Sequence, residues 1–247
     1  LLANEPDQSK IQFQKESDLL LVGKQTYFLE DKEGKLSIED ILNPEIQSRF
    51  QLNQKTIFAQ KPTNSAFWLK LNIENQTGKD VWLELGSTFL WTIDYYALND
   101  GKYVLVTSTG AQRPEVNKAY PSNLFWLPLG NQKEQNIVYI RIFTQRPIAI
   151  PIQVGSILSL GQNKTKQDFI IAAAVGIIVV MFFYNVFLFF STKDKLYFWY
   201  FCYVLFTLPT LLHLHNFPIL KFIFPEKIAL FLDSHPFVWF YLTIIFI

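Results

Sequence analysis

Four side chains that are able to bind a metal ion lie near the C-terminal end of the sequence. They are His213, His215, Asp233 and His235, and histidine and carboxylate groups are common zinc ligands. A single residue separates His213 from His215, which does not place both side chains on one helix face as an i, i+4 spacing does. A membrane enzyme with a metal at these residues is one hypothesis, and a position at the water interface is the alternative. We expect no metal site and no cofactor.

Elsewhere the sequence contains no pattern that is typical of catalysis. Cys202 is the only cysteine, so neither a disulfide within the chain nor a cysteine-rich metal site is expected. We find no paired nucleophile and base, no phosphate-binding glycine loop and no pair of carboxylates. The net charge is +1 without a basic cluster, which argues against nucleic acid as a partner. We therefore expect no catalytic residues.

Aromatic residues are the main candidates for ligand binding, because an indole or phenol ring can stack on a sugar while its polar atom stays in water. Trp68 and Trp82 lie on the polar side of their predicted strands. They either form such a platform or, as their place within architectural motifs favours, pack beneath a loop or the helix of residues 38–42. The other candidates, in or near less regular segments, are Trp91, Arg113, Tyr120 and Trp126. The expected partner is a glycan or a small organic ligand.

Short β-strands are the elements that would position these residues. Residues 67–73 and 81–85 alternate between core-forming and polar or tryptophan side chains, which predicts strands with one buried face. Asp100-Gly101, between strands predicted at 92–98 and 103–107, is typical of a tight hairpin. Further strands are predicted at 124–129, 137–143 and 148–154. Many short strands at this spacing indicate an antiparallel sandwich, of the jelly-roll kind, as the fold of the first domain.

One helical turn interrupts the strands. Ser37 is typical of a helix N-cap, acidic residues follow it in the first turn, and Pro44 is expected to stop the helix.

Long apolar runs follow the predicted strands. The segment 169–190 is 22 residues long and contains no charged residue. As a helix it would be about 33 Å long, enough to cross a hydrocarbon core of about 30 Å. A short polar segment at 191–195 leads to a second apolar run at 196–214. Pro209 is expected to kink this second helix. The lipid bilayer is therefore an expected partner.

Tyr184 and Asn185 are the main polar positions inside the first apolar run, and we expect them to contact neighbouring helices. A third run, residues 237–247, would be only about 16 Å long as a helix and is too short to cross a bilayer. The expectation is therefore that the sequence is a fragment of a longer protein. We predict two domains, a β-sandwich at 1–162 and the first transmembrane α-helices of an incomplete bundle at 163–247.

Several segments occur in an order that is similar to one group of bacterial proteins. They are Tyr27–Asp31, Leu36–Leu42, Ser65–Leu71, Trp82–Leu85, Tyr184–Phe189 and Asp194–Tyr200. Together they resemble the seven-transmembrane receptors with diverse intracellular signalling modules, with their type 2 extracellular domain. The segment Lys61–Asn64 departs from the pattern, because it lacks the glycine expected before the tryptophan motif.

The resemblance implies an extracytoplasmic jelly roll similar to carbohydrate-binding modules, seven membrane helices and a cytoplasmic output. In relatives this output is commonly a histidine kinase or a diguanylate cyclase. The expected function is that of a signal receptor in the bacterial inner membrane, with its first domain outside the cytoplasm and with homodimerisation through the membrane and the output. Lysines on both sides of the first apolar run leave the orientation undecided by charge. The alternative is a membrane-anchored carbohydrate-binding or adhesion module without signalling.

Overall fold

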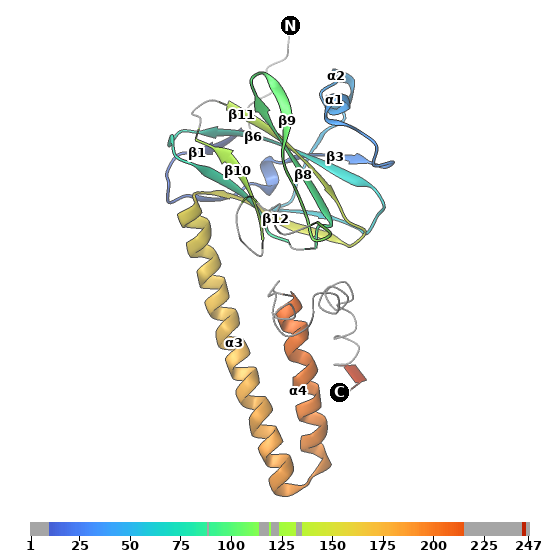
Figure 1. The fold of residues 1–247 in the computed structure, drawn as a ribbon, viewed down its shortest axis with the longest axis vertical. Coiled ribbons are helices and arrows are strands. Elements are labelled where there is room, and N and C mark those ends of the chain that lie inside the picture. Colours follow the sequence, from blue (N-terminus) through green and yellow to red (C-terminus); the bar gives the residue numbers. More distant parts are fainter. Residues whose placement is uncertain are drawn as a thin grey trace. The chain divides into compact units, whose positions relative to one another are not determined.

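A computed structural model of the chain describes residues 10–87, 89–113, 119, 124–131, 135–214 and 244–245. The chain divides into two compact units, residues 1–162 and 163–247. The first unit consists mostly of β-strands with short helices, and the second contains long apolar helices (Figure 1).

Sheet A is the larger of the two sheets in the first unit. Its strands follow the order β4-β3-β6-β11-β8-β9, and β1 pairs in parallel with the end of β6. Its other pairings are antiparallel. The strands are β1 (Lys10–Phe13), β3 (Tyr27–Asp31), β4 (Gln51–Leu52), β6 (Ala66–Asn75), β8 (Thr92–Asn99), β9 (Lys102–Thr109) and β11 (Gln135–Phe143).

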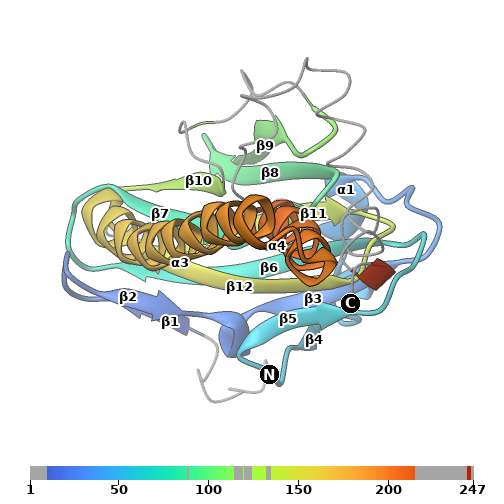
Figure 2. The same ribbon diagram turned by 90° about the horizontal axis from the view of Figure 1, so that it is seen from below.

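Sheet B is smaller and wholly antiparallel. Its strands follow the order β10-β7-β12-β2, and β5 also pairs with β12. They are β2 (Leu19–Leu21), β5 (Ile57–Gln60), β7 (Val81–Leu85), β10 (Phe125–Gly130) and β12 (Ile148–Gly155). Figure 2 shows β10, β7 and β12 side by side.

The hydrophobic core lies between the two sheets, because each contributes the inward side chains of its alternating strands. Leu69 and Leu71 of β6 and Leu83 and Leu85 of β7 are fully buried in this core. The Tyr95 hydroxyl of sheet A donates a hydrogen bond of 2.7 Å to the carbonyl oxygen of Pro128 in sheet B. The predicted sandwich is thus confirmed, with one parallel pair at the edge of sheet A.

The hairpin predicted from Asp100-Gly101 is confirmed. Asn99 pairs with Lys102, and the two residues between them have φ angles of 48° and 77°. Two successive positive φ angles are what a type I′ turn requires, and its twist matches that of the flanking strands. β8 and β9 therefore form a tight ribbon at one end of sheet A.

Two short helices, which we call the α1–α2 cap, lie on the outer face of sheet A. Ser37 is the N-cap of α1 (Ile38–Ile41): its hydroxyl accepts a hydrogen bond from the Asp40 N–H, and the Asp40 carboxylate accepts one from the Ser37 N–H. Pro44 does not simply stop this helix, because it occupies the first position of α2 (Pro44–Gln47). Proline is favoured there, since the first turn of a helix leaves its N–H groups unpaired.

The helices α3 (Ile157–Thr192) and α4 (Lys195–Leu214) contain the two predicted apolar runs, and both are long and apolar enough to cross a membrane. Pro209 lies inside α4. Phe182 and Phe189 of α3 pack edge-on against Phe201 of α4. α3 begins well before the predicted run, at Ile157, and its first residues, up to Gln162, belong to the sandwich unit. The third run, 237–247, lies outside the described residues except for helical residues 244–245.

Candidate functional site

The outer face of sheet A carries two rows of side chains that each cross five strands. Strand register places the members of each row side by side, next to the α1–α2 cap. The first, which we call the charged row, contains Leu29, Trp68, Arg141, Asp94 and Ser108. The second, the aromatic row, contains Tyr27, Lys70, Tyr139, Tyr96 and Leu105.

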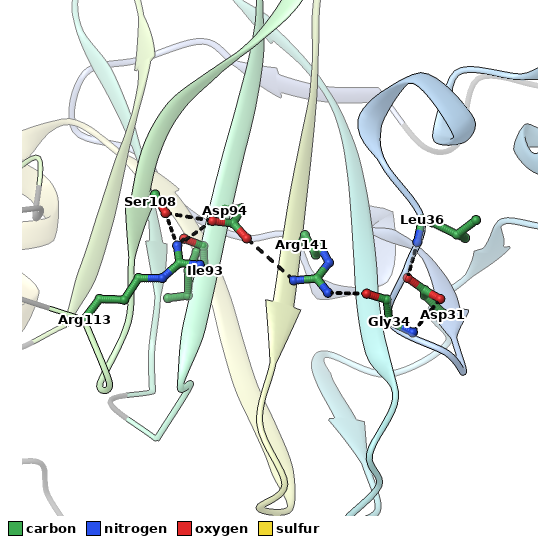
Figure 3. Close-up of polar contacts among 8 residues, drawn as sticks. All are labelled: Asp31, Gly34, Leu36, Ile93, Asp94, Ser108, Arg113 and Arg141. Atoms are coloured by element: carbon green, nitrogen blue, oxygen red, sulfur yellow. Dashed lines mark hydrogen bonds and ion pairs between the residues drawn. The ribbon is translucent and has the colours of Figure 1, made fainter.

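Asp94 of the charged row lies between two guanidinium groups, those of Arg113 and Arg141 (Figure 3). Nη1 of Arg113 is 2.5 Å from one oxygen of the Asp94 carboxylate, and it also contacts the Ser108 hydroxyl and the Ile93 carbonyl oxygen. Nη1 of Arg141 is 3.6 Å from the other carboxylate oxygen. One carboxylate thus contacts two guanidinium groups, that of Arg141 within the row and that of Arg113 beside it.

Arg141 also fixes the turn that leads into the α1–α2 cap. Its Nη2 donates a hydrogen bond of 2.9 Å to the carbonyl oxygen of Gly34, and the Asp31 carboxylate accepts hydrogen bonds from the N–H groups of Gly34 and Leu36 (Figure 3). Arg113, a ligand candidate in the sequence, therefore belongs to a polar network that extends from β9 to the cap. The contact of Arg113 with Asp94 depends on how β8 pairs with β9, and the sequence analysis did not predict it.

Trp68 lies beneath the α1–α2 cap and not on an open surface. Its side chain is 1% exposed and packs in one cluster with Ile38, Ile41 and Tyr139. Trp68 is therefore packed beneath the helices and has no ring face exposed to solvent on which a sugar could stack. Its indole N–H is buried and has no hydrogen-bond partner among the described residues.

Lys70 is the charged member of the aromatic row. Its ammonium group donates a hydrogen bond of 2.7 Å to the Gln47 side chain and lies 5.9 Å from the centre of the Phe50 ring. Burial lowers the pKa of Lys70. Tyr103 packs edge-on against Tyr139 with 5.1 Å between ring centres, and burial raises its pKa to about 12.

The outer face of sheet B holds a third hydrophobic group, which we call the anchor cluster. It consists of Leu19, Trp82, Leu124, Trp126 and Leu160. Trp126 is 5% exposed, and its indole N–H donates a hydrogen bond of 2.6 Å to the Glu84 carboxylate. Trp82 is half-buried in the same cluster. The structure thus places both tryptophans in packing with the first turns of α3.

The first turn of α3 fits closely against the sandwich. A Cβ atom on Gly155 would lie 2.6 Å from Oγ of Ser159 and 3.3 Å from Cγ of Leu160. The Ser156 hydroxyl accepts a hydrogen bond from the Ser159 N–H, as an N-cap does, and donates one to the carbonyl oxygen of Glu16. The pair of serines three residues apart was a signal of this helix start that the sequence interpretation missed.

An open cleft of about 500 Å³ lies beside this turn, lined in part by Glu16, Lys79, Ser156 and Leu158. Lys79 and Glu16 form an ion pair at 2.5 Å across it. Lys79 of the cleft already has a carboxylate partner. The cleft is therefore a weaker candidate for binding an anion than the outer face of sheet A, where Lys70 contacts a neutral side chain.

Trp91, another ligand candidate, is not a member of either row. Trp91 is half-buried and packs edge-on against Phe143, with ring centres 5.9 Å apart. Tyr120 lies outside the described residues.

The polar residues of the membrane helices also differ in their placement. Asn185 is buried, and its amide donates a hydrogen bond of 2.7 Å to the Met181 carbonyl oxygen in the same helix, whereas Tyr184 is exposed. His213 lies in the last turn of α4, and the other three candidate metal ligands lie outside the described residues. Among the residues that the structure describes, no group of three potential metal ligands occurs.

Comparison with known families covers most of the chain. Residues 23–156, more than half of the chain, match the family described as 7TMR-DISM extracellular 2, and residues 167–247 match the family described as 7TM diverse intracellular signalling. A search among curated proteins gives no match. The β-sandwich therefore corresponds to the extracellular sensor domain, and the apolar helices to the membrane domain. The chain belongs to the seven-transmembrane receptors with diverse intracellular signalling modules.

Proposed function

We propose that the sandwich binds a glycan or a small organic ligand outside the cytoplasm of a bacterium and passes this signal through α3 to a cytoplasmic output. The output would be a histidine kinase or a diguanylate cyclase in a domain that follows the membrane helices. The family to which the chain belongs supports a receptor in the membrane, and the start of α3 supports the route of the signal.

One observation carries this proposal: α3 is a single helix that begins inside the anchor cluster and continues into the apolar run. Leu160 is 1% exposed in this cluster, whereas Leu158, two residues earlier, is 63% exposed. Helix α3 extends without a break from Ile157 to Thr192. A change at its first turn can therefore reach the membrane segment without a flexible linker.

The ligand would act by preferring one of two arrangements of the sandwich, because a ligand that binds both equally shifts nothing. Strands β7 and β10 carry Trp82 and Trp126 against the first turn of α3, and the Glu84 carboxylate of β7 holds the Trp126 indole. A small shift of these strands would move Leu160 and with it the helix. The membrane helices then supply the two-state element that sets the activity of the output.

Alanine insertions after Gln162 test this route in the full-length receptor. Each inserted residue rotates the helix beyond it by about 100°, so that four residues restore its original face to within about 40°. We expect insertions of one or two alanines to change the basal output, and an insertion of four to restore most of it. The same insertions between Lys61 and Pro62, which are both exposed, serve as the control and should leave the output unchanged.

An output that is indifferent to every insertion after Gln162 would contradict the proposal. It would favour the alternative of an anchored binding or adhesion module, in which the helices only hold the sandwich at the membrane. Sequencing the reading frame beyond Ile247 identifies the output directly, since the proposal requires further membrane spans followed by a catalytic domain.

A further inference from the structure

Lys70 differs from the other cations that the structure describes on the outer face of sheet A. Lys10 lies 2.8 Å from Glu74, and both Arg113 and Arg141 contact Asp94. For Lys70, the contacts among the described residues are the neutral Gln47 side chain and the ring of Phe50.

An ammonium group that is partly removed from water without a counter-charge is costly, and an anion nearby reduces this cost. The lowered pKa of Lys70 comes from burial alone, without a contribution from a neighbouring carboxylate. The position of Lys70 at the middle of sheet A is set by the pairing of β6 with β3 and β11, which puts Tyr27 and Tyr139 on either side of it. The sheet therefore holds this cation in a fixed place.

Aromatic and apolar side chains extend the surface beside Lys70. Tyr96 and Tyr103 are partly exposed there, and Leu98 and Leu105 of the same two strands are 52% and 51% exposed. Phenol rings of this kind can pack against the C–H face of a sugar ring, while their hydroxyl groups form hydrogen bonds with its hydroxyl groups. A neutral sugar would use the rings but would leave Lys70 without a counter-charge.

We propose that the aromatic row, together with Tyr103 beside it, is the binding site for an acidic sugar, a pyranose that carries a carboxylate. Lys70 binds the carboxylate, and Tyr96 and Tyr103 pack against the ring. This proposal rests on the proposed function, since it specifies the ligand class and the surface used by the same sensor domain.

Calorimetric titration of the full chain in detergent tests the proposal with three probes: D-glucuronate, D-glucose and acetate. Glucuronate has both the ring and the carboxylate, whereas each of the other two lacks one of them. We expect glucuronate to bind at least about tenfold more tightly than either. Glucose lacks the charge-assisted hydrogen bond to Lys70, which is worth about tenfold in affinity over a neutral one, and acetate lacks the ring that Tyr96 and Tyr103 contact.

Two variants at Lys70 and one control identify the cation. K70M is expected to bind glucuronate no better than glucose, and K70R to retain a preference for the acid, because the charge is kept. K10M, on the same face but at a lysine that already has a carboxylate partner, should bind as the unchanged chain does. Where K70M does not fold, the loss of the preference is measured with K70Q.

Failure to bind glucuronate, or glucuronate binding in K70M equal to that of the unchanged chain, would overturn this assignment. Equal binding of acetate and glucuronate would also overturn it, since the rings would then contribute nothing. The insertion experiment at Gln162 measures the basal output without a ligand. The proposed receptor function can therefore stand when the acidic-sugar site fails, and the reverse also holds.

Discussion

The indole N–H of Trp126 donates a hydrogen bond of 2.6 Å to the carboxylate of Glu84 on the outer face of sheet B, where both side chains are almost fully buried. Cross-strand register places these two residues directly opposite each other on β10 and β7. The hydrogen bond between them forms where little water is present, so removing one group leaves the other to lose this contact in a buried place.

We therefore expect Glu84→Ala to lower the free energy of unfolding by about 2–3 kcal/mol, the cost of an unsatisfied buried donor and a lost charge-assisted hydrogen bond. Glu84→Gln should cost less, because its amide oxygen can still accept from the indole. Denaturant unfolding followed by tryptophan fluorescence measures both. Glu33→Ala, which removes an exposed ion pair with Lys35, is the control and should change stability by less than about 1 kcal/mol.

Leu160 and Leu158 provide a matched pair in the first turn of α3. Leu160→Ala should lower the free energy of unfolding by about 2–4 kcal/mol, because it leaves a cavity in the anchor cluster. Leu158→Ala removes an exposed side chain and should cost less than about 0.5 kcal/mol. The same unfolding experiment compares them, and equal losses would show that the anchor cluster does not hold the helix.

Gly110 and Gly101 both have positive φ angles but differ in their surroundings. A Cβ atom on Gly110 would lie 2.2 Å from the backbone oxygen of Trp91, whereas one on Gly101 would meet no atom of the described residues within 4 Å. Gly101→Ala should therefore cost about 1 kcal/mol, for the left-handed conformation alone. Gly110→Ala should cost at least about 3 kcal/mol, since strain and a backbone clash add. Thermal unfolding of the two variants should separate them, and similar midpoints would contradict this.

Stability should fall at high pH because of Tyr103. Burial favours its neutral phenol and raises its pKa to about 12 in the folded chain, while an unfolded tyrosine has a pKa of about 10. Its contribution is therefore complete below pH 10 and is lost as the pH rises from about 10 to about 12. Unfolding measured at about pH 9 and about pH 11.5 should show a smaller decline in Tyr103→Phe. An unchanged decline in that variant would assign the effect to other groups, such as the buried Tyr95, whose pKa burial also raises.

The strands that could be predicted are those long enough to display a period of two. β6 and β7 alternate over their whole length, and Asp100-Gly101 provides the turn chemistry between β8 and β9. By contrast, β2 has three residues and β4 has two, which is too short for any pattern. They form because a neighbouring strand has an edge free for pairing. For β2 that neighbour is β12, which is distant in the sequence, so the residues of β2 alone do not predict the strand.

Trp68 and Trp126 show what a local pattern leaves out. Alternation correctly places Trp68 on the face opposite to the main core, yet that face is covered too, by Ile38 and Ile41 from another part of the chain. The alternation within a strand determines on which face of the sheet a residue lies. Whether that face is buried depends on other segments of the chain that pack on it. For the same reason Lys70 did not stand out, since only the structure shows that its contacts among the described residues include no carboxylate.

Because β6 lies inside sheet A, with one side in the core and the other partly covered by the α1–α2 cap, its amide hydrogens should be among the last in the sandwich to exchange with solvent. Leu69 packs in the core between the sheets and Trp68 in the group beneath the α1–α2 cap, so that neither layer can open without disturbing the same strand. Local opening is cheapest where few buried contacts are lost. β6 therefore joins the cap and the two sheets into one cooperative unit, and a ligand on the outer face would slow hydrogen exchange well beyond the residues that it touches.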